Sequence, residues 1–183
     1  MGSVFVTVGT DHHPFQRLVD WADRLAAADP GLTVTVQYGT AEPPRTATGH
    51  AALPYDAVVR LMRAADVVVA QGGPGGIMDA RASGRLPVVV PRDPALGEHV
   101  DDHQQRFAAH LHAQGRIALA TDEADLHRLV RRALADPAGF TVAPQQSPTA
   151  ATARAIEASL DVVLRRTAQR SRRPSWLRTP AAG

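Results

Sequence analysis

Short runs of β-branched and other apolar residues alternate along the chain with segments whose apolar residues recur every three or four positions. The short runs are typical of buried strands, and the wider spacing is typical of helices with one buried face. Because the two alternate, the pattern predicts an α/β fold with a Rossmann-like, doubly wound parallel sheet. The predicted strands are residues 4–8, 33–38, 67–70, 87–90 and 117–120, with a short one near 51–53. The predicted helices are residues 15–28, 56–65, 103–114 and about 149–166, with one more after Gly76 and another after the cap at 121–123.

The charge distribution separates a main body from a basic C-terminal end. We predict a domain over residues 1–137, a linker with a final helix over 138–170, and a disordered basic tail over 171–183. From Arg165 onward the sequence holds six arginines and no acid, so with a net charge of +2 for the chain the preceding residues carry −4. A body of this charge argues against nucleic-acid binding. The basic end favours contact with anionic lipid or an acidic partner, unless it is only solvated.

Length and composition exclude several classes of protein. The 183 residues are enough for one ordinary domain with a hydrophobic core. Because the sequence has no cysteine, a disulfide framework, a thiol nucleophile and a cysteine metal site are excluded. The first residues lack the charged start and long apolar core of a signal peptide, and the longest apolar runs are too short to span a bilayer. We therefore expect a cytoplasmic protein, or one peripheral on a membrane.

A glycine-rich turn, Gln71-Gly72-Gly73-Pro74-Gly75-Gly76, joins a predicted strand to a helix. Without side chains in the way, its backbone amides can approach a ligand closely, and the helix N-terminus favours a diphosphate. The turn matches neither the dinucleotide fingerprint nor the phosphate-loop motif, since no lysine follows it. A plain tight turn remains the alternative. We expect Asp79 on the first turn of this helix, where a carboxylate can bind both hydroxyls of a ribose or simply offset the helix dipole.

Two polar loops follow the first and fourth of the main predicted strands. His12 and His13 lie in the loop at the end of the first strand, and a loop dense in acids, histidines and amides covers residues 97–105. Acids and amides suit sugar hydroxyls, because each can pair with two adjacent groups. His99, Asp101 and His103 alternate, so a metal-dependent hydrolase remains an alternative, although one such cluster is poor evidence for zinc. No serine–histidine–acid arrangement is visible.

Three motifs in this order resemble the C-terminal, donor-binding domain of glycosyltransferase family 28. They are VFVTVGT at the start, DVVVAQGGPGGIMDARASGRLPVVVP in the middle, and GEHVDDHQQRFAAHLHAQG after it, and the likeness covers about residues 4–135. Within the family, the sequence is most similar to short single-domain members. These include PssE-like subunits of exopolysaccharide transferases and the catalytic subunit of the dolichol-linked UDP-GlcNAc transferase.

The resemblance implies a set of donor-binding residues. In the family, the first loop and the glycine turn face the diphosphate, an acid binds the ribose, and two amides bind the donor sugar. Two departures affect donor affinity and donor choice: the acid is usually glutamate, so Asp79 is one methylene shorter, and Gly76 often corresponds to serine. The matching positions in this sequence are Gly9, Thr10, Gly73, Gly75, Gly76, Asp79, Gln104 and Gln105.

The resemblance also implies one half of a GT-B glycosyltransferase. Such an enzyme transfers a sugar, with inversion, from a UDP-sugar to a lipid-linked acceptor, here in exopolysaccharide or glycolipid synthesis. A membrane-anchored partner subunit would supply the acceptor half and hold this chain at the cytoplasmic face of the membrane. The family implies no cofactor and no active-site metal, because a helix end offsets the leaving diphosphate.

The catalytic base is expected on the acceptor half. On this chain, the residues that we expect at the same edge of the sheet are His12, His13 and Glu98. Neutral imidazole is available near pH 7, which favours the two histidines. A non-catalytic nucleotide-sugar-binding module that regulates a partner is the alternative function.

Overall fold

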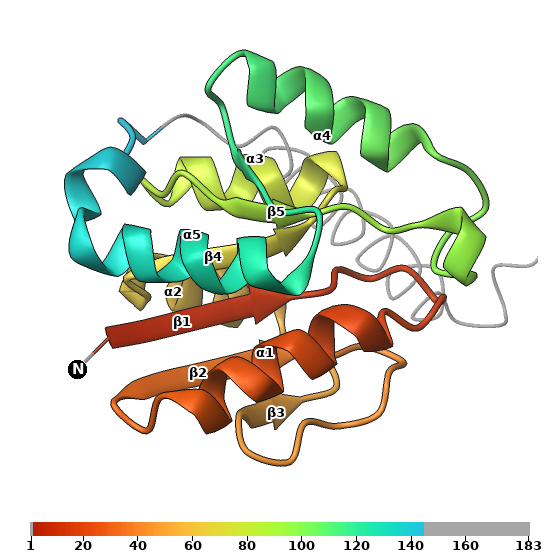
Figure 1. Ribbon diagram of the computed structural model, residues 1–183, viewed down its shortest axis with the longest axis horizontal. Coiled ribbons are helices and arrows are strands. Elements are labelled where there is room, and N and C mark those ends of the chain that lie inside the picture. Colours follow the sequence, from red (N-terminus) through yellow and green to blue (C-terminus); the bar gives the residue numbers. More distant parts are fainter. Residues whose placement is uncertain (1, 145–183) are drawn as a thin grey trace, which may run out of the picture. The chain divides into compact units, whose positions relative to one another are not determined.

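The computed structural model describes residues 2–144 (Figure 1). The chain divides into two compact units, residues 1–147 and residues 148–183, and only the first unit is described below. The helix predicted at about 149–166 and the basic tail predicted at 171–183 lie outside the described residues.

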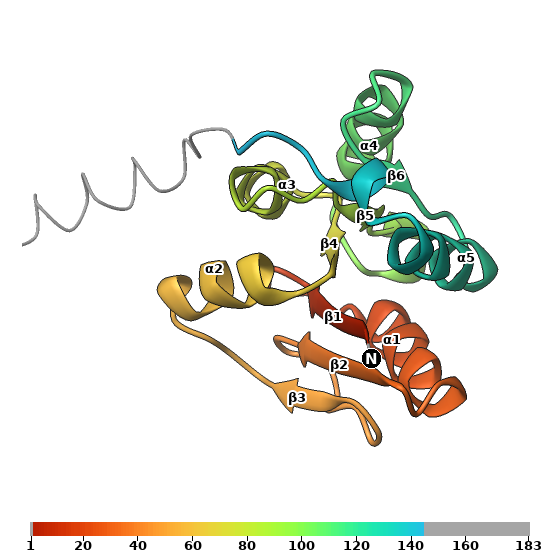
Figure 2. The same ribbon diagram turned by 90° about the vertical axis from the view of Figure 1, so that its left-hand side faces the viewer.

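Six parallel strands form one sheet, in the order β3-β2-β1-β4-β5-β6. From β1 the chain builds outward to β3, then returns beside β1 and builds outward in the other direction to β6 (Figure 2). This order is that of a doubly wound parallel sheet, the class of fold that the sequence predicts. The strands are β1 (Gly2–Thr7), β2 (Leu32–Gln37), β3 (Thr48–His50), β4 (Val67–Gln71), β5 (Val88–Val90) and β6 (Ala118–Leu119). The short strand expected near 51–53 lies at residues 48–50 instead, because the pairing of Thr35 with Thr48 sets its register.

Helices cover both faces of the sheet, as Figure 2 shows. On one face, apolar residues of α1 and α5 pack against the strands, and on the other face those of α2, α3 and α4 do so. The helices are α1 (Gln16–Ala28), α2 (Tyr55–Ala64), α3 (Pro74–Ala82), α4 (His103–Ala113) and α5 (Glu123–Ala135), with 3-10 turns η1 (Pro94–Leu96) and η2 (Pro137–Phe140). None of the helices in this part of the chain has the length and hydropathy needed to cross a bilayer.

The packed region continues past the domain boundary predicted at residue 137. Phe140 is buried, and its carbonyl accepts a 2.8 Å hydrogen bond from the Leu86 N–H. Val142 donates to the Gly84 carbonyl at 3.0 Å. Because these contacts close the end of the sheet near β5, residues up to Val142 belong to the folded unit.

The strand order determines where a ligand can bind. β1 and β4 are neighbours in the sheet, but the connections after them run in opposite directions. The carboxyl ends of such strands leave an opening between the two loops, which is where doubly wound sheets bind their ligands. The loops after β1, β4 and β5 meet at this edge, and they hold most of the residues singled out in the sequence.

Candidate functional site

The glycine turn after β4 leaves the first turn of α3 open to a ligand. Gly73 is the N-cap and provides no side-chain cap, and the Ile77 N–H makes the first helical bond, 3.4 Å to the Gly73 carbonyl. The N–H groups of Gly75 and Gly76 precede that bond, so they have no partner within the helix. A Cβ placed on Gly75 would meet no atom within 4 Å, and one on Gly76 would approach only Ala70, at 3.9 Å. The space where side chains would stand at Gly75 and Gly76 is therefore open, at the positive end of the helix.

Other glycines bring the loops after β1 and β4 close together. Gly9 has a φ of +77°, and a Cβ there would lie 2.7 Å from Nε2 of Gln71. A Cβ on Gly73 would lie 2.3 Å from the same nitrogen, whereas the Gly73 N–H donates to Gln71 Oε1 at 3.1 Å. The side chain of Gln71 thus fills the space between the two loops, and any larger residue at Gly9 or Gly73 would displace it. Thr10 follows Gly9 and is exposed.

Polar side chains at the ends of β1 and β2 fix the position of the loop after β1. The Thr7 hydroxyl donates to Gln37 Oε1 at 2.6 Å and accepts from the Gly9 N–H at 3.2 Å. Nε2 of Gln37 donates in turn to the Gly9 carbonyl at 3.2 Å. Both side chains are buried, so their polar atoms need these partners. The start of the loop is therefore held in place on the side of β2.

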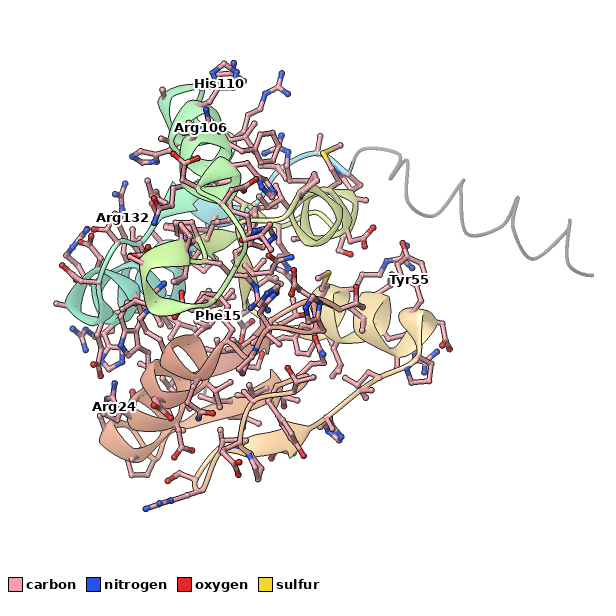
Figure 3. The ribbon with its side chains drawn as sticks, turned by 90° about the vertical axis from the view of Figure 1, so that its right-hand side faces the viewer. Phe15, Arg24, Tyr55, Arg106, His110 and Arg132 are labelled. Atoms are coloured by element: carbon pink, nitrogen blue, oxygen red, sulfur yellow. The ribbon has the colours of Figure 1, made fainter. Side chains whose placement is uncertain are left out.

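Asp79 lies one turn further along α3 than the sequence predicts. Because α3 begins at Pro74, Asp79 is on its second turn, where only 7% of its surface is exposed. Its Oδ1 accepts a 2.9 Å hydrogen bond from the hydroxyl of Tyr55. Tyr55, at the start of α2 and labelled in Figure 3, is 38% exposed. A ligand reaching Asp79 would therefore also meet this tyrosine.

The two glutamines at the start of α4 differ in their surroundings. Gln104 is 3% exposed, and its Oε1 accepts from the Arg92 N–H at 3.3 Å. A Cβ on Gly72 would lie 3.0 Å from the Gln104 Cβ, so Gln104 packs directly against the glycine turn. Gln105 is half-buried. Of the two side chains, Gln105 is thus the more accessible one, and Gln104 supports the turn from behind.

A buried arginine connects the loops after β1 and β5. Arg92 is fully buried, and its guanidinium donates to the main-chain carbonyls of Val8 at 2.9 Å, His13 at 2.7 Å and Glu98 at 3.0 Å. It also lies 4.7 Å from the ring centre of Phe15. Burial lowers the pKa of Arg92, while nearby carboxylates oppose that shift. Arg92 thus fixes the positions of three loop segments relative to one another.

Glu98, one of the three candidates for the base, is engaged in an ion pair. It is 4% exposed, and its carboxylate binds Arg17 through two hydrogen bonds of 2.7 and 2.9 Å. The same carboxylate accepts from the Asp93 N–H at 2.8 Å. With these three bonds made, Glu98 is suited to hold the loop after β5 against α1.

Four histidines gather around two aspartates at the same edge. Asp11 Oδ1 lies 2.7 Å from His13 Nδ1 and 3.7 Å from His12 Nδ1, and Asp11 Oδ2 lies 3.4 Å from His99 Nε2. Burial alone would raise the pKa of Asp11, but hydrogen bonds from His13 and the charge of Arg92 outweigh it and hold that pKa below its ordinary value. His12 is largely exposed, with 86% of its side chain accessible.

The loop after β5 adds the second half of this group. His103 and Asp101 form a hydrogen bond, and His99 Nδ1 lies 3.7 Å from Asp101 Oδ1. The ligand atoms of His99, Asp101 and His103 lie within 4.8 Å of one another, and those of Asp11, His12 and His13 do so as well. The fold therefore joins two short sequence motifs that the sequence shows only separately.

The structure brings the predicted residues to one edge of the sheet and adds others that sequence reasoning missed. Arg92 carried a usable signal, as the first charged residue after a run of buried valines. Buried cations are rare unless they have dedicated partners. The contacts of Tyr55, Gln71 and Asp11 carried no comparable signal, because each depends on a residue distant in the sequence or on the path of a loop. The missed residues are Asp11, Arg17, Gln37, Tyr55, Gln71 and Arg92.

Comparison with known proteins identifies the family. The model of the glycosyltransferase family 28 C-terminal domain matches residues 3–158. Among solved structures, the chain is similar to the glycotransferase of kitacinnamycin, with 23% identity and a TM-score of 0.58. It is also similar to CalG4, the calicheamicin glycosyltransferase, with 17% identity and a TM-score of 0.56. A comparison with curated proteins gave no match.

Both structural matches cover about three quarters of this chain, 76% and 75%, and 36% of the other chain. The chain thus spans about a third of the length of those structures. At these identities the likeness concerns the fold, which is that of the C-terminal half of GT-B glycosyltransferases, as the sequence predicts. Because the family model covers most of the sequence, the chain belongs to the glycosyltransferase family 28 C-terminal domain family.

Proposed function

We propose that this domain binds a UDP-sugar and serves as the donor half of a two-component glycosyltransferase. The enzyme transfers the sugar, with inversion, to a lipid-linked acceptor at the cytoplasmic face of a membrane, in exopolysaccharide or glycolipid synthesis. Membership in the family implies a UDP-sugar donor. The observation that carries the proposal is the open first turn of α3, where Gly75 and Gly76 leave the space of a side chain unfilled at the point where the loops diverge.

The geometry supports a different set of residues for each part of the donor. The diphosphate binds at the glycine turn, where the amides and the helix end offset the charge that grows on it as the sugar departs. The ribose binds toward Asp79 and Tyr55, which lie on the second turn of the same helix and on its neighbour. The sugar extends toward the start of α4, where Gln105 is accessible. Gly9 and Thr10 face the diphosphate from the opposite loop.

The base is proposed to come from the partner subunit. The carboxylate of Glu98 already has three hydrogen bonds, and His13 is bonded to Asp11. A base must lie within hydrogen-bond reach of the acceptor hydroxyl, and His12 is the exposed candidate on this chain. The membrane-anchored partner would provide both the base and the acceptor site.

Calorimetric titration with UDP tests donor binding directly. Gly75→Glu places a carboxylate at the second residue of α3, in space that holds no atom within 4 Å of the new Cβ. The matched control is Ala124→Glu, which adds the same charge at the exposed second residue of α5. We expect Gly75→Glu to weaken UDP binding at least ~10-fold, about 1.4 kcal/mol, by repulsion of the diphosphate. Equal binding of UDP by both variants would show that the phosphates do not bind at this turn.

A transfer assay tests the requirement for two components. Purified chain, UDP-sugar and lipid-linked acceptor are combined with and without the partner subunit, and product is measured. We expect product only when the partner is present. Full turnover by this chain alone would contradict the two-component proposal and place the base on this chain.

The engaged state of Glu98 and the burial of Asp79 favour one other function, a donor-binding module that regulates a partner without catalysis. Such a module would bind UDP-sugar yet give no transfer with any partner that it binds. The same assay separates the two functions, because catalysis predicts that loss of UDP binding in Gly75→Glu abolishes transfer by the assembled pair.

A further inference from the structure

The loops after β1 and β5 form an imidazole–carboxylate group at the site edge that the proposed function does not use. It consists of Asp11, His12 and His13 from the first loop and His99, Asp101 and His103 from the second. The rings follow one another closely, with centroids 4.0 Å apart for His12 and His13, and 4.6 Å apart for His99 and His103. Neutral imidazole and ionised carboxylate are metal ligands, and such a concentration of them is the chemistry of a transition-metal site.

Asp11 lies at the centre of the group, close to ring nitrogens from both loops. From the Asp11 carboxylate, ring nitrogens lie at 2.7 Å for His13, 3.4 Å for His99 and 3.7 Å for His12. Four ligands around a tetrahedral zinc ion, with bonds of about 2.0 Å, are separated from one another by about 3.3 Å. The values from Asp11 lie on both sides of that separation, and the rings of His13 and His99, with centroids 6.0 Å apart, would turn toward each other to hold an ion between them.

We propose that Asp11, His13 and His99 bind a Zn²⁺ ion, with the exposed His12 as the fourth ligand. The first three side chains are only 23%, 24% and 11% exposed, and they come from two loops far apart in the sequence. The ion would therefore fix the loop after β1 to the loop after β5. Nitrogen-rich ligands select zinc over magnesium and calcium, which prefer oxygen.

The surroundings orient these ligands as metal sites require. The His13 N–H donates to Asp11 Oδ1 at 2.8 Å, and the His13 carbonyl accepts from Arg92 at 2.7 Å. Nε2 of His99 faces Asp11 at 3.4 Å, while its Nδ1 accepts a 3.4 Å hydrogen bond from the Asp101 N–H and lies 3.7 Å from the Asp101 carboxylate, so Nδ1 must turn its proton to that carboxylate when Nε2 binds an ion. A carboxylate behind a ligating histidine is the usual support of such a ring. The charge of Arg92 acts against a nearby cation, and Asp11 and Asp101 provide the two negative charges that offset the ion.

A site formed by His99, Asp101 and His103 alone is the competing arrangement. The side chains of Asp101 and His103 are 55% and 48% exposed, and all three residues come from one loop. An exposed loop loses more freedom when it binds an ion than two loops that are already held in place by Arg92. The observations thus favour the site shared between the loops.

The ion is not required for the donor site that we propose, so the two proposals can fail separately. The full chain is treated with EDTA, dialysed and titrated with ZnCl₂ at pH 7.5 in a calorimeter, and melting temperatures are measured with ZnCl₂ or MgCl₂. We expect one zinc ion per chain, a higher melting temperature with zinc and no change with magnesium. UDP binding is measured in EDTA on the same preparation, and we expect it to persist.

Single substitutions then locate the ion. Asp11→Asn keeps the shape of the side chain, so it preserves the fold even if His99→Ala does not, and both are expected to weaken zinc binding at least tenfold. His110→Ala removes an exposed histidine of α4, labelled in Figure 3, that does not belong to the group, and it should leave zinc binding unchanged. His103→Ala should also leave it unchanged. Absence of zinc binding, equal affinity in Asp11→Asn and wild type, or a loss confined to His103→Ala would overturn the proposal.

Discussion

Removal of the buried Arg92 guanidinium should destabilise the domain more than any change at an exposed arginine. In Arg92→Ala, the carbonyls of Val8, His13 and Glu98 lose donors at 2.7–3.0 Å in a site with no exposed surface. A hydrogen bond from a charged donor contributes about 1.5–3 kcal/mol, so the three bonds of Arg92 together contribute about 4.5–9 kcal/mol. The cost of burying the cation is recovered at the same time. We therefore expect the free energy of unfolding to fall by about 3–5 kcal/mol, a large part of the usual total of about 5–15 kcal/mol.

Urea unfolding followed by far-UV circular dichroism measures this loss. With an m-value of about 2 kcal/mol/M, the midpoint should fall by about 2 M. The control is Arg106→Ala, whose side chain is 74% exposed and pairs with Asp102 on the surface, so its midpoint should shift by less than about 0.5 M. Arg92→Lys keeps the charge but cannot donate to three separate carbonyls, and its loss should be intermediate. Equal, small shifts in Arg92→Ala and Arg106→Ala would refute the reasoning.

Three further predictions concern pH, the donor sugar and the basic end. Burial would raise the pKa of Asp23, but hydrogen bonds from the N–H groups of residues 45–47 outweigh it and lower that pKa. The contribution of Asp23 to stability is therefore present above pH ~4 and is lost as the pH falls through the pKa of Asp23 in the folded state. Unfolding measured from pH 6 to pH 2 should thus show a weaker pH dependence in Asp23→Asn, and an unchanged slope would contradict this. Gln105→Ala should weaken binding of a UDP-sugar while UDP itself binds as before in calorimetry; a parallel loss for both ligands would show that the residue acts through the loop. Deletion of residues 165–183 should reduce flotation with anionic liposomes, and added salt should do the same for the full chain; unchanged flotation would exclude a lipid contact.

Local pattern was enough to predict most of the architecture. The valine runs of β1, β4 and β5 are buried on both faces, so each appears in the sequence as a continuous apolar segment. The helix bounds follow from spacing and from stop signals such as Gly115, which has a φ of +65°. β3 was misplaced by three residues, because its sequence Thr-Gly-His has no apolar pattern and only its pairing with β2 defines it as a strand.

The candidate site was predicted less completely, since its contacts connect residues far apart in the sequence. Local reasoning placed Gly75 and Gly76 at the start of a helix, and the structure shows free space beside them. It could not show that Asp79 is buried against Tyr55, because that contact depends on how α2 packs beside α3. Nor could it show that His13 and His99 lie near each other. Their loops meet only because β1, β4 and β5 are neighbours in the sheet.

Glu98 shows why the sequence of a polar loop does not identify a base. An acid beside a histidine and two further acids has the composition of a proton-transfer site, and the spacing of the loop is equally suited to an ion pair. The difference lies in Arg17, on the first turn of α1, which reaches the carboxylate only because α1 follows β1 and lies beside the loop after β5. These two bonds, with a third from the Asp93 N–H, leave the carboxylate facing protein donors and not an acceptor hydroxyl. The contacts of Glu98 therefore favour our proposal that the base comes from a partner subunit.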